Sequence, residues 1–241
     1  MRKFSKNILF DDHEFASICE QFSATFPKNV IENAHHNFSW GGAKSFKEAT
    51  EQRQSVANIF SSWVRSGCCE KGASEAIQIV HKWGFGGQGL NKNQVVLLEP
   101  EYLNHFVEMT KTWYEGNDPA RMRETLSICL RTPYLKIARF SKWICFIDQS
   151  KYAIYDSRVS LALRQIKLDG KRVFPTLGAK SKVRPTADFI STDPIKVAEQ
   201  VSQIYMVYLD LLHNLLPQTS LNSVADIEMG LFMLGVNDEY W

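Results

Sequence analysis

The sequence predicts a mainly α-helical protein. Apolar residues recur at helical spacing in most segments longer than ten residues, whereas alternating, strand-like runs are short and scarce. The 241 residues, 44% of them hydrophobic and 12% aromatic, suffice for the core of one domain or of two closely packed lobes. No repeat, low-complexity tract or linker divides the chain, so residues 1–241 are expected to fold as one unit.

The first half of the chain predicts four long helices. Apolar periodicity indicates helices over 11–22, 47–65 and 74–83. The third is followed by the glycine-rich segment 84–89, which is expected to be a loop because so many glycines make a helix costly. Pro100 is suited to the start of a helix, and the apolar pattern after it continues to residue 115.

The second half predicts further helices with clear start and stop signals. Asp118 and Pro119 provide a cap and a first-turn proline for a helix to about residue 131, before Pro133. Two shorter helices are expected within 134–147, joined by a tight turn, with the Ser141 hydroxyl capping the second. Asp156 stands where the cap of the next helix is expected.

The segment 170–188 interrupts this pattern and is expected to be a polar loop. A long helix then begins at Asp193 and Pro194 and is expected to reach residue 216, before Pro217. A last amphipathic helix is expected over 223–234, ending at Gly235.

Charge and cysteine content limit the classes of protein that fit. The 28 Lys and Arg nearly balance the 26 Asp and Glu, so the net charge of +2 does not identify a partner. The five cysteines are an odd number without paired spacing, which favours a reducing compartment and gives no metal or iron–sulfur motif. No apolar run approaches the ~20 residues of a membrane span. We therefore expect a cytoplasmic protein without a metal or cofactor.

A lysine and an aspartate stand 14 residues apart within a recognisable pattern. The run Arg139–Trp143 contains Lys142, and the box Tyr155–Val159 contains Asp156. This pattern resembles the core of the helix-hairpin-helix DNA glycosylases, and more narrowly the bacterial proteins of the 8-oxoguanine-glycosylase fold. The resemblance is centred on about 120–166, with support from 226–232, and implies a two-lobed helical fold.

The hairpin of this chain departs from the family pattern. The family usually has a leucine-proline-glycine-x-glycine turn that holds a DNA phosphate, whereas residues 137–141 contain no glycine. The spacing between Lys142 and Asp156 is also shorter than is usual. A phosphate contact is expected instead from Arg139, Ser141 and the amides at the helix start, and also from Arg158.

The resemblance implies catalytic roles for Asp156 and Lys142. Cleavage of an N-glycosidic bond builds positive charge on the sugar, which a nearby carboxylate, here Asp156, would stabilise. A neutral Lys142 would attack C1′ and form a Schiff base that permits strand cleavage, whereas a charged Lys142 would only bind DNA. Apart from the resemblance, such an aspartate is most often only a helix cap and such a lysine only a surface group.

A basic segment indicates contact with nucleic acid. Between Arg164 and Arg184 seven basic residues accompany one acidic residue, Asp169. Such a segment suits DNA phosphates, although a solvated loop has the same composition. The residues expected to bind DNA here are Lys171, Arg172, Lys180, Lys182 and Arg184.

Aromatic residues are expected to hold a base that leaves the double helix. Base flipping costs a few kcal/mol of stacking energy, which stacking in a pocket recovers. Most aromatic residues of a helical protein fill its core, so we expect only one or two to serve this purpose. The candidates near glycines or near Lys142 are Phe38, Trp40, Trp83, Phe85 and Trp143.

The sequence therefore predicts a DNA glycosylase that acts on double-stranded DNA and leaves an abasic site. The resemblance allows two substrates, glucosylated hydroxymethylcytosine in defence against phage and 8-oxoguanine in repair. A non-catalytic DNA-binding module of the same fold is an alternative, favoured by the glycine-free hairpin. A helical regulator or toxin that binds RNA or a protein through the basic segment is another.

Overall fold

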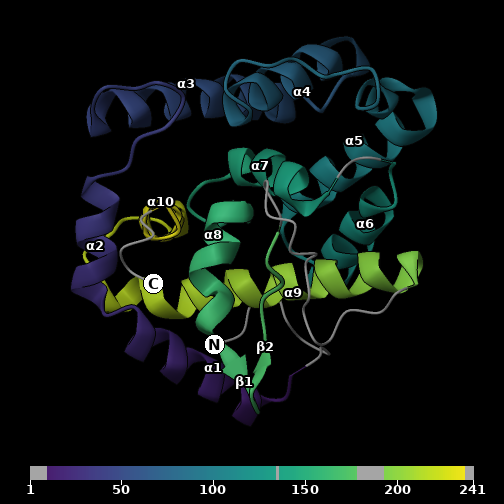
Figure 1. Ribbon diagram of the computed structural model, residues 1–241. Coiled ribbons are helices and arrows are strands. Elements are labelled where there is room, and N and C mark those ends of the chain that lie inside the picture. Colours follow the sequence, from purple (N-terminus) through teal and green to yellow (C-terminus); the bar gives the residue numbers. More distant parts are fainter. Residues whose placement is uncertain (1–9, 134–135, 178–192, 237–241) are drawn as a thin grey trace.

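The computed structural model describes residues 10–133, 136–177 and 193–236 (Figure 1). These residues form ten α-helices and one two-stranded sheet, which confirms the predicted mainly helical class. The α-helices are α1 (Asp12–Thr25), α2 (Lys28–His36), α3 (Phe46–Arg65), α4 (Glu70–Gly84), α5 (Pro100–Glu115), α6 (Pro119–Leu130), α7 (Ile137–Ile147), α8 (Ser157–Ala162), α9 (Pro194–Leu215) and α10 (Val224–Leu234). The short 3₁₀ helices are η1 (Val95–Leu98), η2 (Leu163–Gln165) and η3 (Leu216–Gln218), and the strands are β1 (Lys167–Leu168) and β2 (Lys171–Arg172).

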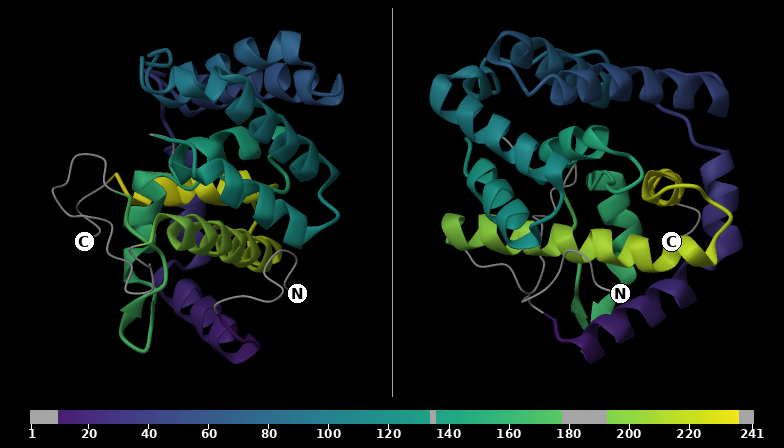
Figure 2. Two further views of the ribbon diagram at one scale, coloured as in Figure 1. Left: turned by 90° about the vertical axis from the view of Figure 1, so that its right-hand side faces the viewer. Right: turned by 180° about the vertical axis from the view of Figure 1, so that it is seen from behind.

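The helices surround α7, which lies in the middle of the molecule. In Figure 1, α3 and α4 form a layer at the top, α7 lies beneath them and α9 crosses the lower half. Helix α7 packs against α3, α4, α5 and α6, and α10 packs against α2 and α8. Figure 2 shows the same layers from the side and from behind. Nine of the eleven residues of α7 are accordingly buried.

Most of the helix boundaries agree with the start and stop signals. The helices predicted over 11–22, 47–65 and 100–115 correspond to α1, α3 and α5. Those predicted from Asp118, from Asp193 and over 223–234 correspond to α6, α9 and α10. Helix α4 starts four residues earlier than predicted, at Glu70, and α2 was not predicted. None of the described helices combines the length and apolarity needed to cross a lipid bilayer.

The predicted break at Ser141 is wrong, because α7 continues through it from Ile137 to Ile147. Ser141 is fully buried. Its Oγ accepts a hydrogen bond from the backbone N of Tyr155 at 3.0 Å and donates one to the Tyr155 carbonyl at 3.3 Å. The hydroxyl therefore links α7 to the segment before Asp156 and does not cap a helix.

The predicted polar loop over 170–188 is wrong in its first part. Strands β1 and β2 pair antiparallel, and Asp169 and Gly170 join them with φ of 51° and 78°. Positive φ at both positions is typical of a tight hairpin turn. Val173 and Phe174, which follow β2, are fully buried. Residues 178–188 lie outside the described residues.

Candidate functional site

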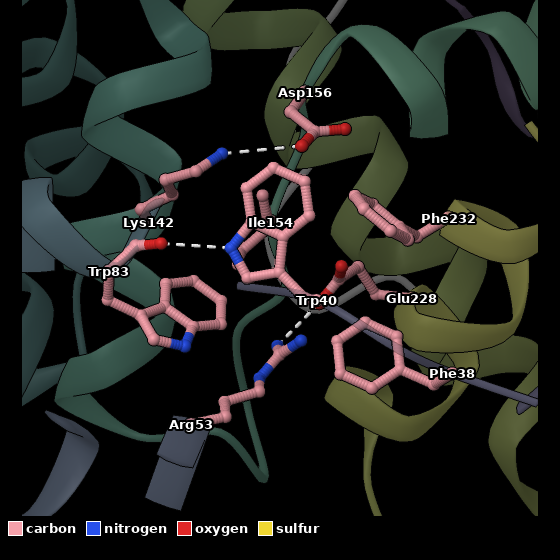
Figure 3. A pocket seen from close by; sticks show the side chains of 9 residues that line it. All are labelled: Phe38, Trp40, Arg53, Trp83, Lys142, Ile154, Asp156, Glu228 and Phe232. Atoms are coloured by element: carbon pink, nitrogen blue, oxygen red, sulfur yellow. Dashed lines mark hydrogen bonds and ion pairs between the residues drawn. The ribbon is translucent and has the colours of Figure 1, made fainter. Parts of the chain in front are cut away.

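A pocket lies where α3, α4, α7 and α10 meet the segments that precede α3 and α8 (Figure 3). As the side chains stand, its free volume is about 10 Å³, which is room for about one water molecule. Both predicted catalytic residues and three of the five candidate aromatic residues line it. The lining residues are Phe38, Trp40, Arg53, Trp83, Lys142, Ile154, Asp156, Glu228 and Phe232.

Asp156 caps α8, as predicted. Its Oδ1 accepts hydrogen bonds from the backbone N of Arg158 at 3.0 Å and of Val159 at 3.2 Å. The other oxygen, Oδ2, lies 3.3 Å from Nζ of Lys142. The carboxylate thus has one oxygen fixed by the helix start and one turned toward the pocket, and its side chain is 13% exposed.

Lys142 lies in the second turn of α7 and is buried. Only 6% of its side chain is exposed. Nζ donates hydrogen bonds to Asp156 and to the carbonyl of Ala138, the latter at 3.2 Å, and lies 5.4 Å from the centre of the Phe85 ring. The surface-group interpretation of Lys142 therefore fails. The fold instead holds the Lys142 amine away from water and beside the Asp156 carboxylate.

A second ion pair, which the sequence interpretation missed, forms another side of the pocket. Arg53 Nη2 of α3 lies 2.5 Å from Oε2 of Glu228 of α10, and the two side chains are 2% and 1% exposed. Burial raises the pKa of Glu228, against the opposing effect of Arg53. A signal was present in the sequence, because Arg53 occupies the apolar stripe of α3 together with Ala49, Ala57 and Phe60.

The aromatic walls of the pocket come from three separate segments. Trp40 Nε1 donates a hydrogen bond to the carbonyl of Trp83 at 2.9 Å, and the centres of the two indoles are 6.5 Å apart. Phe232 meets the face of Trp40 nearly at a right angle, with ring centres 5.4 Å apart. The Arg158 guanidinium lies over both rings, 5.1 Å from the centre of Trp40 and 4.7 Å from that of Phe232.

Trp143 and Phe85 do not line the pocket, although both were candidates. Trp143 is 1% exposed and donates a hydrogen bond from Nε1 to the carbonyl of Ile77 at 3.2 Å. Successive residues of a helix point about 100° apart, so Lys142 and Trp143 cannot both face the same pocket. Phe85 instead stacks on His81 at 4.5 Å, and the Arg139 guanidinium lies 4.7 Å from the centre of its ring.

The residues predicted to bind DNA are placed very differently. Ser141 is buried in the core and offers no surface to a phosphate. Arg139 is half-buried on α7, where burial lowers its pKa. Lys171 and Arg172 form β2. Asp156 lies at the start of α8, whereas β2 comes after the other end of α8 and after η2 (Figure 1). Lys180, Lys182 and Arg184 lie outside the described residues.

The charges of the site are arranged as two acid–base pairs inside an aromatic enclosure. Lys142 and Asp156 form one pair and Arg53 and Glu228 the other. A carboxylate in such a site can stabilise positive charge on a nearby atom, and the rings could stack on a flat molecule only after Trp40, which stands among the lining side chains, moves aside. Among the described residues, no three or more His, Cys, Asp and Glu side chains gather as metal ligands.

Comparisons of this chain with models of protein families, with curated proteins and with solved structures found no match.

Proposed function

We propose that this protein is a DNA glycosylase of the helix-hairpin-helix type, acting on a base flipped out of double-stranded DNA. The observation that supports this most is the 3.3 Å contact between Lys142 Nζ and Asp156 Oδ2 in an aromatic pocket. The two residues come from a helix interior and a helix cap, 14 residues apart. The resemblance in the sequence assigns the catalytic roles to this same pair.

Asp156 acts at the sugar in this proposal. As the bond between C1′ and the base nitrogen breaks, its electron pair leaves with the base and C1′ becomes positively charged. The Asp156 carboxylate stabilises that charge and accepts a proton from the water whose oxygen attacks C1′. Lys142 orients Asp156, since its amine donates a hydrogen bond to Oδ2.

A lyase route requires Lys142 to release its proton first. A neutral Nζ then attacks C1′, expels the base and forms a Schiff base after ring opening. Reduction of that Schiff base by borohydride would leave a stable enzyme–DNA adduct. We expect a trapped adduct that is lost in Lys142→Met if the enzyme is a lyase, and no adduct in the parent protein if water is the nucleophile.

Trp40 controls access to the pocket in this proposal. Its indole stands among the other lining side chains in Figure 3, where a hydrogen bond to Trp83, ring contacts and the Arg158 guanidinium hold it. It belongs to the segment between α2 and α3, next to Gly41 and Gly42 with φ of 67° and 83°. These glycines allow the segment to bend, so Trp40 turns aside and stacks on the incoming base.

Mass spectrometry of released bases tests the proposal. Duplexes containing 8-oxoguanine and phage DNA containing glucosylated hydroxymethylcytosine are incubated side by side with the protein. Release of either base, with abasic sites in the DNA, is the expected result and also distinguishes repair from phage defence. Release of neither base would overturn the proposal.

A non-catalytic DNA-binding module of the same fold is the second candidate. It is favoured by the segment 137–141, expected to be the hairpin turn, which contains no glycine for a close phosphate contact and lies within α7. Asp156 would then be only a cap and an ion-pair partner. Salt-sensitive DNA binding without abasic sites is the outcome expected of such a module.

A further inference from the structure

Two hydrogen-bond donors in the pocket have no acceptor among the described residues. Arg53 is 2% exposed, and its Nη1 is buried without a partner. The Nε1 of Trp83 is likewise buried without a partner. A buried donor without an acceptor is unfavourable, because it has lost its hydrogen bonds to water and gained none in the protein. Both residues line the pocket, so a ligand that brings acceptors would remove this cost.

The other groups of Arg53 are occupied and fix its orientation. Nε donates to Gln149 Oε1 at 2.9 Å, and Nη2 donates to Glu228 at 2.5 Å and to Sγ of Cys145 at 3.3 Å. Only Nη1 is left for a ligand. Since three separate elements hold the guanidinium, the direction of this donor is set before any ligand binds.

The polar groups of the pocket stand in a defined order. Arg53 lies between the Trp83 indole, 5.8 Å from its centre, and the Glu228 carboxylate (Figure 3). In this order the pocket offers Trp83 Nε1 as a donor, Arg53 Nη1 as a donor and the Glu228 carboxylate as an acceptor. The complementary ligand is flat and offers an acceptor, an acceptor and a donor in the same order.

We propose that this row reads the Watson–Crick edge of a cytosine-type base. The inference rests on the proposed glycosylase function. Cytosine O2 accepts from Trp83, N3 accepts from Arg53, and the exocyclic amine donates to Glu228. The base then has its sugar on the side of Lys142 and Asp156, which Figure 3 shows across the pocket from Arg53.

Other bases fit this row less well. A uracil-type base presents N3–H to the central donor and a carbonyl to the carboxylate, so two positions are mismatched. Guanine and 8-oxoguanine present N1–H to Arg53 in either orientation. Adenine matches Arg53 and Glu228 but leaves Trp83 without an acceptor. Sites that hydrogen-bond a substrate group discriminate strongly against an analogue that lacks it.

Two duplexes that differ only in this edge test the proposal. One carries 5-hydroxymethylcytosine and the other 5-hydroxymethyluracil. Each modified base lies opposite a tetrahydrofuran spacer, so that it is unpaired and flipping it breaks no base pair. Single-turnover release is measured with the parent protein and with Glu228→Gln, whose amide can donate to the uracil carbonyl. Glu108→Gln is the matched control, because it makes the same substitution at an exposed ion pair with Arg121, outside the pocket.

The parent protein is expected to release 5-hydroxymethylcytosine at least about 100-fold faster, about tenfold for each mismatched position. Glu228→Gln should reduce this ratio at least about tenfold, and Glu108→Gln should leave it unchanged. Equal rates, or release of 8-oxoguanine alone, would overturn the cytosine assignment but keep the glycosylase. Release of no base from any substrate would overturn the proposed function itself.

Discussion

Gly84, the last residue of α4, leaves the space that the Lys142 side chain fills. A β-carbon at Gly84 would lie 2.5 Å from Cδ and 2.7 Å from Cε of Lys142. These atoms belong to a flexible side chain, so a methyl group at Gly84 would displace the lysine and leave the backbone in place. The absence of a side chain at residue 84 therefore positions the amine beside Asp156.

Gly84→Ala is expected to lower base release at least tenfold, because misplacing a catalytic group by about 1 Å can cost up to 10²-fold in rate. Thermal stability should change little, since alanine is a better helix former than glycine. Gly89→Ala is the matched control, because nothing lies within 4 Å of its β-carbon. Unchanged release in Gly84→Ala would show that the position of Lys142 is irrelevant to the reaction.

His81 is expected to make the folded protein less stable in acid. Burial lowers the pKa of His81 from 6.5, while Arg139 and Lys142 also disfavour its charged form. As the pH falls, His81 therefore binds a proton more readily in the unfolded chain than in the folded protein. Its contribution to the free energy of unfolding is complete above about pH 6.5 and is lost as the pH falls through the folded-state pKa.

His81→Phe keeps a ring to stack on Phe85 and removes the titration. Melting temperatures at about pH 7.5 and pH 5.5 should differ less in this variant than in the parent protein. The variant loses the hydrogen bond between Nδ1 and the carbonyl of Gln88, a loss that lowers stability at both pH values. An equal fall in both proteins would assign the acid sensitivity to other groups.

Lys171 is expected to contribute to the salt dependence of DNA binding. If the basic segment neutralises ~4 phosphates, the slope of log K against log salt is about −3.6. Lys171→Ala should reduce the magnitude of that slope by about 0.9 at any DNA sequence. Lys47→Ala, at an exposed lysine paired with Glu51, should leave it unchanged. If the two variants gave identical slopes, DNA would bind at a surface other than the basic segment.

Local signals explain which parts of the fold could be predicted. The caps at Asp118 and Asp156 involve hydrogen bonds to amides two or three residues away, so the nearby sequence is sufficient to predict them. Serine, like aspartate, is a preferred helix cap, but Ser141 is buried in the middle of α7. Its hydroxyl finds a partner 14 residues away in the chain, and no helix end forms.

Only tertiary packing brings together the parts of the site that the sequence interpretation missed. Arg53 and Glu228 are 175 residues apart, and each appears alone in an apolar stretch of its helix. A charged residue in an apolar stripe indicates a buried partner but does not identify it. Lys142 and Asp156 were found through a sequence pattern, whereas the pocket around them depends on how α3 and α10 pack.

Asp156→Asn under single-turnover conditions tests the central claim most directly. Asparagine keeps an oxygen to cap α8 and removes the negative charge, so DNA affinity should stay close to that of the parent protein. Asp118→Asn, which changes the cap of α6 away from the pocket, is the control. We expect Asp156→Asn to slow base release by about 10²–10³ or more and Asp118→Asn to have no effect on it. Base release by Asp156→Asn at the rate of the parent protein would contradict the account.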